Sequence, residues 1–394
     1  MTLKILLTSP TYPPFNSGLG NAVQQQAAIL TARGFSVVVA TGGKQRGQRR
    51  DEVSGALVEE FRVQGADCWL DPIRGDTASY MNFLIESNFD IVLMNAWQTW
   101  STDLCLGNLK RISGRKVLYS NCLSTNVFFQ HQPLRSLVRY LFWRPYWWKL
   151  PEKLRQLDGF IVTAEEGCDS RFDDLKVARR LGISFAVVQN ALSKESLACL
   201  QQPVVEYNSR KELIAVGSYS WQKGHDFVLR AYALSKAKNR IPLKVFGQSF
   251  SVFTDQLRWL AESLGIRGEY VSFHEGISGA ALIEEYTRSV ALLSGSYTEC
   301  QPLVLLDSMA TGTPFVARSS GCIPTMSGGH GVRTEVEAAS AIDLLITGGI
   351  EWTHLSSAGR NEAELKYHPD KVGQNLISAL LGGGHDNGMR SLLQ

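Results

Sequence analysis

The chain has 394 residues, 44% of them hydrophobic and 20% charged, a composition typical of a globular protein rather than a disordered or fibrous one. Its 40 Lys and Arg residues against 37 Asp and Glu residues leave a formal net charge of +3, so the strong basic excess of nucleic-acid-binding proteins is absent. None of its seven histidines lies in residues 1–130, which excludes chemistry that needs an early histidine.

The first ten residues hold an apolar run too short for a signal peptide, and we expect a strand there. No run of about 18 apolar residues follows, so the sequence predicts no membrane-spanning helix and a cytoplasmic location. No two of the seven cysteines have the CxxC spacing of a zinc or redox site.

Short apolar runs alternate with helical patterns through the first half. A strand at residues 4–7 leads through a Pro- and Gly-containing loop to a helix at 21–33, which Gly34 ends. Further strands are expected at residues 36–40, 91–94, 116–119, 160–163 and 185–188. Strands that alternate with helices predict a parallel sheet covered on both faces.

A polar stretch at residues 193–210 precedes a second series of the same kind. Strands are expected at residues 213–216, 243–246, 270–273, 290–293 and 314–317. We therefore predict two doubly wound α/β domains, residues 1–195 and 196–368, with a C-terminal helix at about 369–382 packing back onto the first. Ligands of such sheets bind beyond the carboxyl ends of the strands, so we expect the functional residues in the loops that follow the strands.

The stretch from 296 to 317 carries the strongest signal, because an acidic loop precedes a helix and a glycine turn. Glu299 lies in the loop, Asp307 in the helix, and Pro302 suits the first helical position. Free N–H groups at a helix start bind phosphate, and a nearby carboxylate binds hydroxyls. The residues indicate a site for a phosphorylated sugar or nucleotide; a solvated acid beside an ordinary amphipathic helix is the alternative.

This stretch resembles the E-x7-E motif of retaining GT-B glycosyltransferases, in particular glycosyltransferase family 4. Glu299 matches the first acid, and Asp307 with the following Ser-Met-Ala-Thr-Gly-Thr-Pro matches the second. The resemblance implies that Glu299 binds the donor sugar and Asp307 the ribose. It also implies donor contacts from the intervening residues Cys300, Gln301 and Leu303.

Residues 215–224 (AVGSYSWQKG) resemble the family's V-G-R…K-G segment, whose cations neutralise the donor diphosphate. Lys223 keeps its place, whereas Ser218 replaces the arginine, and Arg318 is a candidate substitute. Preorganised cations stabilise the charge of a departing diphosphate, and losing such a group costs about 10²–10³ in rate. Gly247 and the sequence His274-Glu-Gly end two strands and resemble loops beside the nucleotide base, with turn glycines and a structural histidine as the alternative.

Residues 12–21 (YPPFNSGLGN) resemble the family's Y-P-P-x-x-G-G loop, which implies that Gly18 and Gly20 admit the donor phosphate and the acceptor. The family often has a histidine after an N-domain strand, and Asn121 is the expected occupant of that position. Because an amide is no base, the sequence favours a retaining transfer in which the departing phosphate takes the acceptor proton. Asp103 as a general base stays open.

Residues 133–155 carry six basic residues against the single acid Glu152, a local charge of +5, interleaved with six aromatic residues. Such a segment is typical of a monotopic contact with an anionic membrane. Pro145 and Pro151 are expected to break it into short pieces. A core helix pair or a surface for a partner protein are the alternatives. The expected contact residues are Arg139, Trp143, Arg144, Trp147 and Trp148.

The resemblance implies a GT-B fold, two Rossmann-like doubly wound parallel-sheet domains facing a central cleft. It implies a metal- and cofactor-independent transfer of a sugar from a UDP- or GDP-linked donor to a saccharide or lipid-linked saccharide. We expect a role in lipopolysaccharide, polysaccharide or glycolipid assembly, peripheral on the cytoplasmic face of the membrane and without nucleic acid. A catalytically degenerate GT-B-like subunit that binds a partner enzyme, favoured by Ser218 and the missing histidine, and a nucleotide-sugar epimerase are the alternatives.

Overall fold

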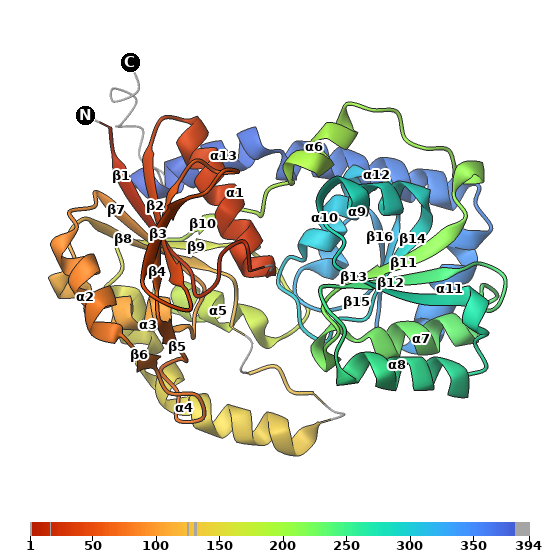
Figure 1. Cartoon of the computed structure of the whole chain (residues 1–394), viewed down its shortest axis with the longest axis horizontal. Helices are drawn as coiled ribbons and strands as arrows, with labels where there is room; N and C mark the ends of the chain where they lie inside the picture. Colours follow the sequence, from red (N-terminus) through yellow and green to blue (C-terminus); the bar gives the residue numbers. More distant parts are fainter. Residues whose placement is uncertain (1, 16, 124–125, 130–131, 383–394) are drawn as a thin grey trace. The chain divides into compact units, whose positions relative to one another are not determined.

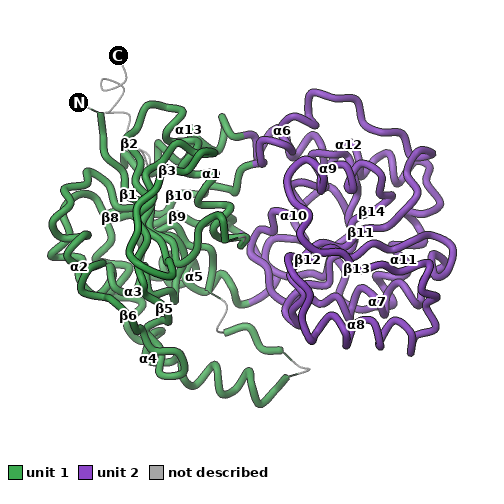
Figure 2. Tube along the Cα trace, in the orientation of Figure 1, with its two compact units in different colours: residues 1–165, 170–191, 369–394 green, residues 166–169, 192–368 purple. Residues whose placement is uncertain are grey.

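The computed structural model describes residues 2–15, 17–123, 126–129 and 132–382. These form two compact α/β units (Figure 2). Unit 1 comprises residues 1–165, 170–191 and 369–394, and unit 2 comprises residues 166–169 and 192–368. The main boundary thus lies at 191/192, against an expected 195/196.

Unit 1 is built on an eight-stranded sheet in the order β10-β9-β8-β7-β1-β2-β4-β3 (Figure 1). All neighbouring pairs are parallel except β3 with β4, which form an antiparallel edge that the sequence analysis missed. A short hairpin, β5 (Val63–Gln64) and β6 (Arg74–Gly75), stands apart. The strands of the large sheet are β1 (Lys4–Thr8), β2 (Ser36–Gly42), β3 (Gly47–Arg50), β4 (Leu57–Phe61), β7 (Ile91–Asn95), β8 (Arg115–Ser120), β9 (Gly159–Val162) and β10 (Ala186–Val187).

Helices cover both faces of this sheet, as the alternation of apolar runs predicted. One core holds Val23 and Leu30 of α1 and Leu376 of α13; the other holds Tyr80 of α2 and Leu150 of α4. The helices are α1 (Gly18–Ala32), α2 (Thr77–Glu86), α3 (Trp100–Leu106), α4 (Pro133–Arg155), α5 (Asp173–Arg180) and α13 (Pro369–Leu381), with the 3₁₀ turns η1 (Leu109–Arg111) and η2 (Ser170–Phe172).

Unit 2 has a six-stranded, wholly parallel sheet in the order β13-β12-β11-β14-β15-β16. Five strands were predicted, and β16 was missed because its sequence, GHGV, has no apolar run. The strands are β11 (Glu212–Val216), β12 (Leu243–Gly247), β13 (Val271–Glu275), β14 (Ser289–Ser294), β15 (Phe315–Arg318) and β16 (Gly329–Val332). The helices are α6 (Lys194–Leu200), α7 (His225–Leu234), α8 (Val252–Ser263), α9 (Gly279–Arg288), α10 (Leu303–Ala310), α11 (Glu335–Ile346) and α12 (Ile350–Tyr367), with the 3₁₀ turns η3 (Tyr207–Ser209), η4 (Trp221–Lys223), η5 (Gly268–Tyr270) and η6 (Ile323–Thr325).

Helix α4 runs unbroken for 23 residues, so the prediction that its two internal prolines break it is wrong. Tyr146, Leu150 and Leu154 are buried in the unit 1 core, and their burial offsets the lost backbone hydrogen bonds. Pro145 lies on the exposed side of the helix. Among the described residues no helix is long and apolar enough to cross a membrane.

Candidate functional site

The loops after β11 and β14 of unit 2 lie in direct backbone contact. Gly224, at φ +59°, and Gly295 make this possible, because a Cβ on either would lie 2.0 Å from the carbonyl oxygen of the other. Tyr297 N–H donates to Gln222 O at 2.9 Å beside this crossing. The two loops that carry the predicted cation and acid are therefore fixed side by side.

Lys223 and Glu299 meet at this crossing. Lys223 Nζ lies 2.6 Å from Glu299 Oε1, with side chains 37% and 14% exposed. The aliphatic stem of Lys223 lies over Gly217, whose missing side chain leaves it room. The structure thus joins the residues expected to bind the donor sugar and the diphosphate into one ion pair at the carboxyl edge of the sheet.

The segment between Glu299 and α10 is packed inside the unit. Cys300, Gln301 and Pro302 are buried, and Leu303 is half-buried. Pro302 is the N-cap and Leu303 the first helical residue, so Pro302 does not take the first helical position that was predicted for it. Behind this segment Gly321, at φ +53°, approaches so closely that a Cβ would lie 2.0 Å from Glu299 O. The backbone of the acidic loop is therefore held from behind.

Asp307 is bonded within unit 2. Its Oδ1 accepts a hydrogen bond from Ser196 Oγ of α6 at 2.5 Å, across 111 residues of sequence. Burial raises the pKa of Asp307 to about 6, against the lowering effect of the Ser196 hydrogen bond. Ser196 is a site residue that the sequence analysis missed, because no local pattern signals so distant a contact.

Two further residues of the diphosphate interpretation lie near the same crossing. Arg318, at the end of β15, stacks on Tyr297 at 4.1 Å and on Phe227 at 5.0 Å. Ser218 is exposed, and its Oγ lies 3.2 Å from Ser220 Oγ. Arg318 is therefore a cation beside Tyr297. Tyr297 in turn contacts Gln222, the residue that precedes Lys223 in the sequence.

The structure gives Gly247 and His274 packing roles. A Cβ on Gly247 would lie 2.4 Å from the Tyr219 ring. His274 stacks on Phe246 at 4.9 Å, and its Nε2 lies 2.8 Å from Ser272 Oγ. Burial and the Lys244 charge lower the pKa of His274. These contacts favour the structural alternative for His274.

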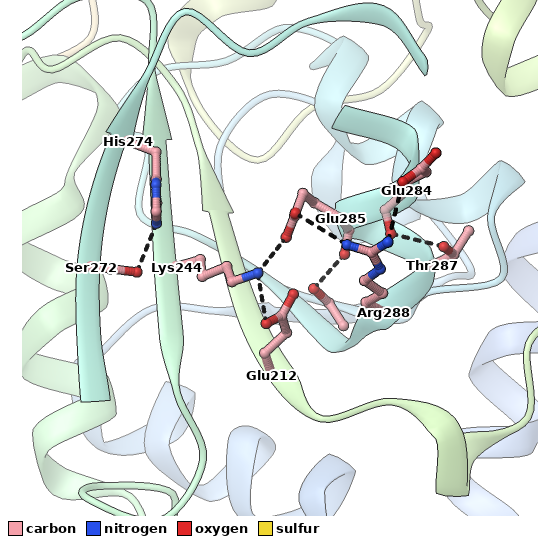
Figure 3. A network of polar contacts seen from close by, with 9 residues as sticks. Glu212, Lys244, Ser272, His274, Glu284, Glu285, Thr287 and Arg288 are labelled. Carbon is pink, nitrogen blue, oxygen red and sulfur yellow. Dashed lines mark hydrogen bonds and ion pairs between the residues drawn. The ribbon is translucent and has the colours of Figure 1, made fainter. Parts of the chain in front are cut away.

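Figure 3 shows His274 on the sheet face that carries Lys244. Lys244 Nζ lies 2.9 Å from Glu212 and 2.8 Å from Glu285, and Arg288 extends the network to Glu284. Glu212 and Arg288 lie at the amino ends of β11 and β14. This charged network therefore belongs to the edge opposite the Lys223–Glu299 pair.

In unit 1, α1 begins at Gly18, so the prediction that both glycines precede a helix starting at residue 21 is wrong. Ser17 Oγ caps the helix by accepting from Gly20 N–H at 2.9 Å, which explains the early start. A Cβ on Gly20 would lie 3.1 Å from Thr11 O, whereas Gly18 is exposed with nothing within 4 Å of such an atom. Gly20 is therefore a packing glycine, and Gly18 is open to a ligand. Asn16 of this loop lies outside the described residues.

Asn121 follows β8, and its Nδ2 is buried without a partner among the described residues. Asn95 ends the neighbouring strand β7 and is fully buried. Its Nδ2 and Oδ1 atoms also have no hydrogen-bond partner among the described residues. The residues Ala96, Gln98 and Cys122 adopt φ between +59° and +65°, which costs energy for residues with a side chain. Neutral amides and strained backbone thus mark this edge of unit 1.

Asp103 is unsuited to be a general base. Its Oδ1 accepts from Tyr146 O–H at 2.8 Å and its Oδ2 from Asp67 N–H at 3.0 Å. Burial raises its pKa to about 6. Both oxygens fasten other elements to α3, so Asp103 has a structural role.

Of the five residues predicted to touch a membrane, some face the unit 1 core and others face solvent. Trp143 and Trp147 pack against the unit 1 core, and Arg139 donates to Val127 O at 2.5 Å. Arg144 stacks on Tyr140 at 4.7 Å, while Trp148 is 71% exposed. The inward orientation of Arg139, Trp143 and Trp147 contradicts their expected role. The outer face of α4 instead carries Leu134, Leu137, Val138, Leu141, Phe142 and Trp148, all exposed.

Residues 200–356 match the family model described as "Glycosyl transferases group 1". That segment belongs to the glycosyl transferases group 1 family. In the described part of the chain, no group of three or more His, Cys, Asp or Glu residues is placed to hold a metal ion.

Two curated relatives align with parts of the chain. Alpha-monoglucosyldiacylglycerol synthase of Streptococcus pneumoniae is 28% identical over 173 residues, 42% of this chain and 38% of the relative. D-inositol 3-phosphate glycosyltransferase of Stackebrandtia nassauensis is 32% identical over 155 residues, 36% of this chain and 35% of the relative. The chain thus spans less than two fifths of the length of these relatives.

Solved structures are similar over nearly the whole chain. Sucrose-phosphate synthase of Thermosynechococcus elongatus covers 97% of this chain and 100% of its own, with a TM-score of 0.72 and 17% identity. Anabaena HepE in complex with UDP and glucose covers 96% and 100%, with a TM-score of 0.64 and 15% identity. These likenesses show that the chain has the GT-B fold.

Proposed function

We propose that the protein is a retaining glycosyltransferase of the family 4 type that moves a sugar from a nucleotide donor to an acceptor hydroxyl. The observation that carries the proposal is the Lys223–Glu299 ion pair at the carboxyl edge of unit 2, within the segment that matches the family. HepE structures are described with UDP and with UDP-glucose, which supports a UDP-linked donor over a GDP-linked one.

On donor binding, the Lys223 ammonium exchanges Glu299 for the diphosphate, and the Glu299 carboxylate accepts hydrogen bonds from sugar hydroxyls. The bond from the anomeric carbon to the phosphate oxygen breaks, and the departing diphosphate gains negative charge. Lys223, Arg318 and the N-terminus of α10 stabilise that charge. Asp307 binds the ribose in competition with Ser196. No metal or cofactor takes part.

The acceptor hydroxyl forms the new bond on the face that the phosphate leaves, and its proton passes to the departing phosphate oxygen. Asn121 and Gly18 of unit 1 hold the acceptor by hydrogen bonds. The amide of Asn121 cannot act as the base that takes the acceptor proton. Retention of configuration follows from attack on the same face. With Asp103 occupied by structural hydrogen bonds, the departing phosphate is the base this proposal requires.

The acceptor is a saccharide or a lipid-linked saccharide of a lipopolysaccharide, polysaccharide or glycolipid pathway. The outer face of α4 exposes Leu134, Leu141 and Trp148 beside Arg144 and Lys149, a combination that suits an anionic membrane surface. The name of one relative, alpha-monoglucosyldiacylglycerol synthase, supports a lipid acceptor. The protein would therefore act on the cytoplasmic face of a membrane.

Thermal shift with UDP, GDP, UDP-glucose and GDP-mannose tests donor binding. Stabilisation by one nucleotide and its sugar derivative is expected, with loss of the shift in Lys223→Ala. Lys211→Ala is the matched control, because exposed Lys211 precedes β11 at the opposite edge of the sheet. No shift with any of these donors overturns the transferase and favours the partner-binding subunit. Conversion of the donor sugar without release of UDP would instead indicate an epimerase.

A further inference from the structure

The loop between β5 and β6 ends in an exposed apolar tip. Trp69 is 89% exposed and Leu70 56% exposed. The backbone around them is closed, since Ala66 N–H donates to Asp71 O at 2.8 Å. An open hollow of about 430 Å³ lies in the loop and is mostly apolar, lined by Ala66, Asp67, Cys68, Trp69, Pro72 and Ile73.

This loop is fastened to α4 (Figure 1). Asp67 N–H donates to Asp103 Oδ2, whose other oxygen accepts from Tyr146 O–H of α4. Lys153 of α4 lies 3.7 Å from the Asp67 carboxylate and 3.6 Å above the Tyr146 ring. Because Asp103 and Tyr146 are buried, the tip holds a fixed position beside the helix.

The outer face of α4 is apolar over most of its length. Its exposed apolar residues between 134 and 142 recur at intervals of three and four, and Trp148 follows Leu141 by about two turns, which places them on one side of the helix. Arg144, half-buried, and Lys149 and Arg155, exposed, lie along the same helix, in a segment with a local charge of +5. Exposed apolar side chains bordered by cations are complementary to an anionic bilayer and not to an acidic, water-exposed protein surface.

The acids of the loop do not oppose such a surface. Asp67 lies 3.7 Å from Lys153, and Asp71 lies 2.8 Å from Arg74. Each carboxylate is thus partnered by a cation, so the tip carries no uncompensated charge toward anionic headgroups. Trp69 at such a tip has the side chain that prefers the headgroup level of a bilayer.

We infer that Trp69 and Leu70 insert into an anionic bilayer as a second contact, next to the outer face of α4. The inference rests on the proposed membrane contact of that helix. A single interfacial helix leaves a protein free to roll about the helix axis. A second insertion point off the axis fixes the face that unit 1 turns toward the lipid, and so the direction from which a lipid-linked acceptor arrives.

Co-sedimentation with vesicles of equal parts phosphatidylcholine and phosphatidylglycerol tests the inference without any donor. Trp69→Ser combined with Leu70→Ser is expected to lower vesicle partitioning about tenfold. Trp259→Ser is the matched control, since Trp259 is 70% exposed on α8 of unit 2, and it should partition like wild type. Melting temperatures of all three proteins should agree, because each change is at an exposed position.

The outcomes separate the two contacts and the transferase. Partitioning of the loop variant equal to that of Trp259→Ser overturns the second contact and leaves the α4 contact standing. Wild type that fails to sediment with the anionic vesicles overturns both. Neither result depends on nucleotide binding, so a failure here is distinguishable from failure of the thermal shift with UDP.

Discussion

Both units are built on a largely parallel sheet covered by helices, but they differ in the chemistry at its carboxyl edge. Unit 2 places charged groups there, Lys223 paired with Glu299 and Arg318 stacked on Tyr297. Unit 1 places the neutral amides Asn95 and Asn121, with buried atoms that have no partner among the described residues. A diphosphate needs cations and a hydroxyl needs neutral donors and acceptors, so under the proposed function one scaffold would serve two classes of ligand.

The units also differ in how these loops are held. In unit 2, Gly224 and Gly295 bring two loops into backbone contact, and the charged pair follows from that contact. In unit 1, Ala96 and Gln98 adopt left-handed backbone despite having side chains. Unit 2 thus reaches its geometry with glycine, and unit 1 with strain that its surrounding core must hold.

The largest effect is expected at the charged edge. Glu299→Gln removes the carboxylate that accepts from the sugar hydroxyls and unpairs Lys223, so kcat for transfer from UDP-glucose should fall about 10²–10³-fold. Glu269→Gln is the control and should match wild type. Glu269 is 63% exposed in η5, which directly precedes β13 and so lies at the amino end of that strand. Equal steady-state rates for Glu299→Gln and wild type would refute the role of Glu299.

A pH-dependent stability difference should come next. Because the pKa of Asp103 is raised from 3.8 to about 6, the folded state binds a proton that the unfolded state has lost in this window. The free energy of unfolding contributed by this group therefore falls as pH rises from 4 to 6, by about 3 kcal/mol at 1.36 kcal/mol per pKa unit.

Urea denaturation of Asp103→Asn at pH 4, 5, 6 and 7 measures it. The decline should be about 3 kcal/mol smaller in the variant, because Asp307, whose pKa is also raised to about 6, still contributes its own share. Asp71→Asn, 61% exposed in the loop between β5 and β6, should retain the wild-type decline. A difference between Asp103→Asn and wild type that does not vary with pH would show that Asp103 titrates normally.

A smaller loss is expected from the second cation. Arg318→Ala should lower kcat/KM for the donor about 10- to 100-fold, because a departing diphosphate would keep only Lys223 as its cation. Arg267 also stacks on an aromatic ring, that of Tyr270 at 4.7 Å, so Arg267→Ala controls for loss of a stacked arginine. Equal donor kinetics in the two variants would show that Arg318 does not take the place of the arginine that Ser218 replaces.

The smallest effect tests the neutral edge. Asn121→Asp replaces an amide N–H donor with an acceptor, so the KM for the acceptor should rise about tenfold while the KM for the donor stays unchanged. Asn121→Ala removes the donor without adding charge and should raise it less. Initial rates at varied acceptor concentration measure the acceptor KM of both variants. A change in the donor KM alone would show that Asn121 contacts the donor and not the acceptor.

Local signals predicted most of the fold. Apolar runs such as residues 36–40 and 290–293 became buried strands, because burial on both faces requires such runs. β3 and β16 were missed because their sequences, GQRR and GHGV, lack them; pairing with a neighbour is what makes them strands. A strand at the edge of a sheet depends on its partner more than on its own side chains.

The site was predicted in part. The motif identified Lys223 and Glu299, but their pairing depends on Gly224 meeting Gly295, 71 residues apart, and Asp307 meeting Ser196 is likewise non-local. The prediction of which α4 residues face outward was wrong for another reason. Both its faces are apolar, so Trp147 and Leu141 look alike in sequence, and only packing against the sheet decides which of them is buried.

The return of α13 to unit 1 has a consequence for synthesis. Val372, Leu376 and Leu380 complete one core of unit 1, although they follow all of unit 2 in the chain. As the ribosome releases the chain, the contiguous stretch 192–368 can finish folding while unit 1 still lacks a helix. The unit translated first is therefore the last to be completed, and a stop codon at residue 369 would leave an apolar groove on it with nothing to fill it.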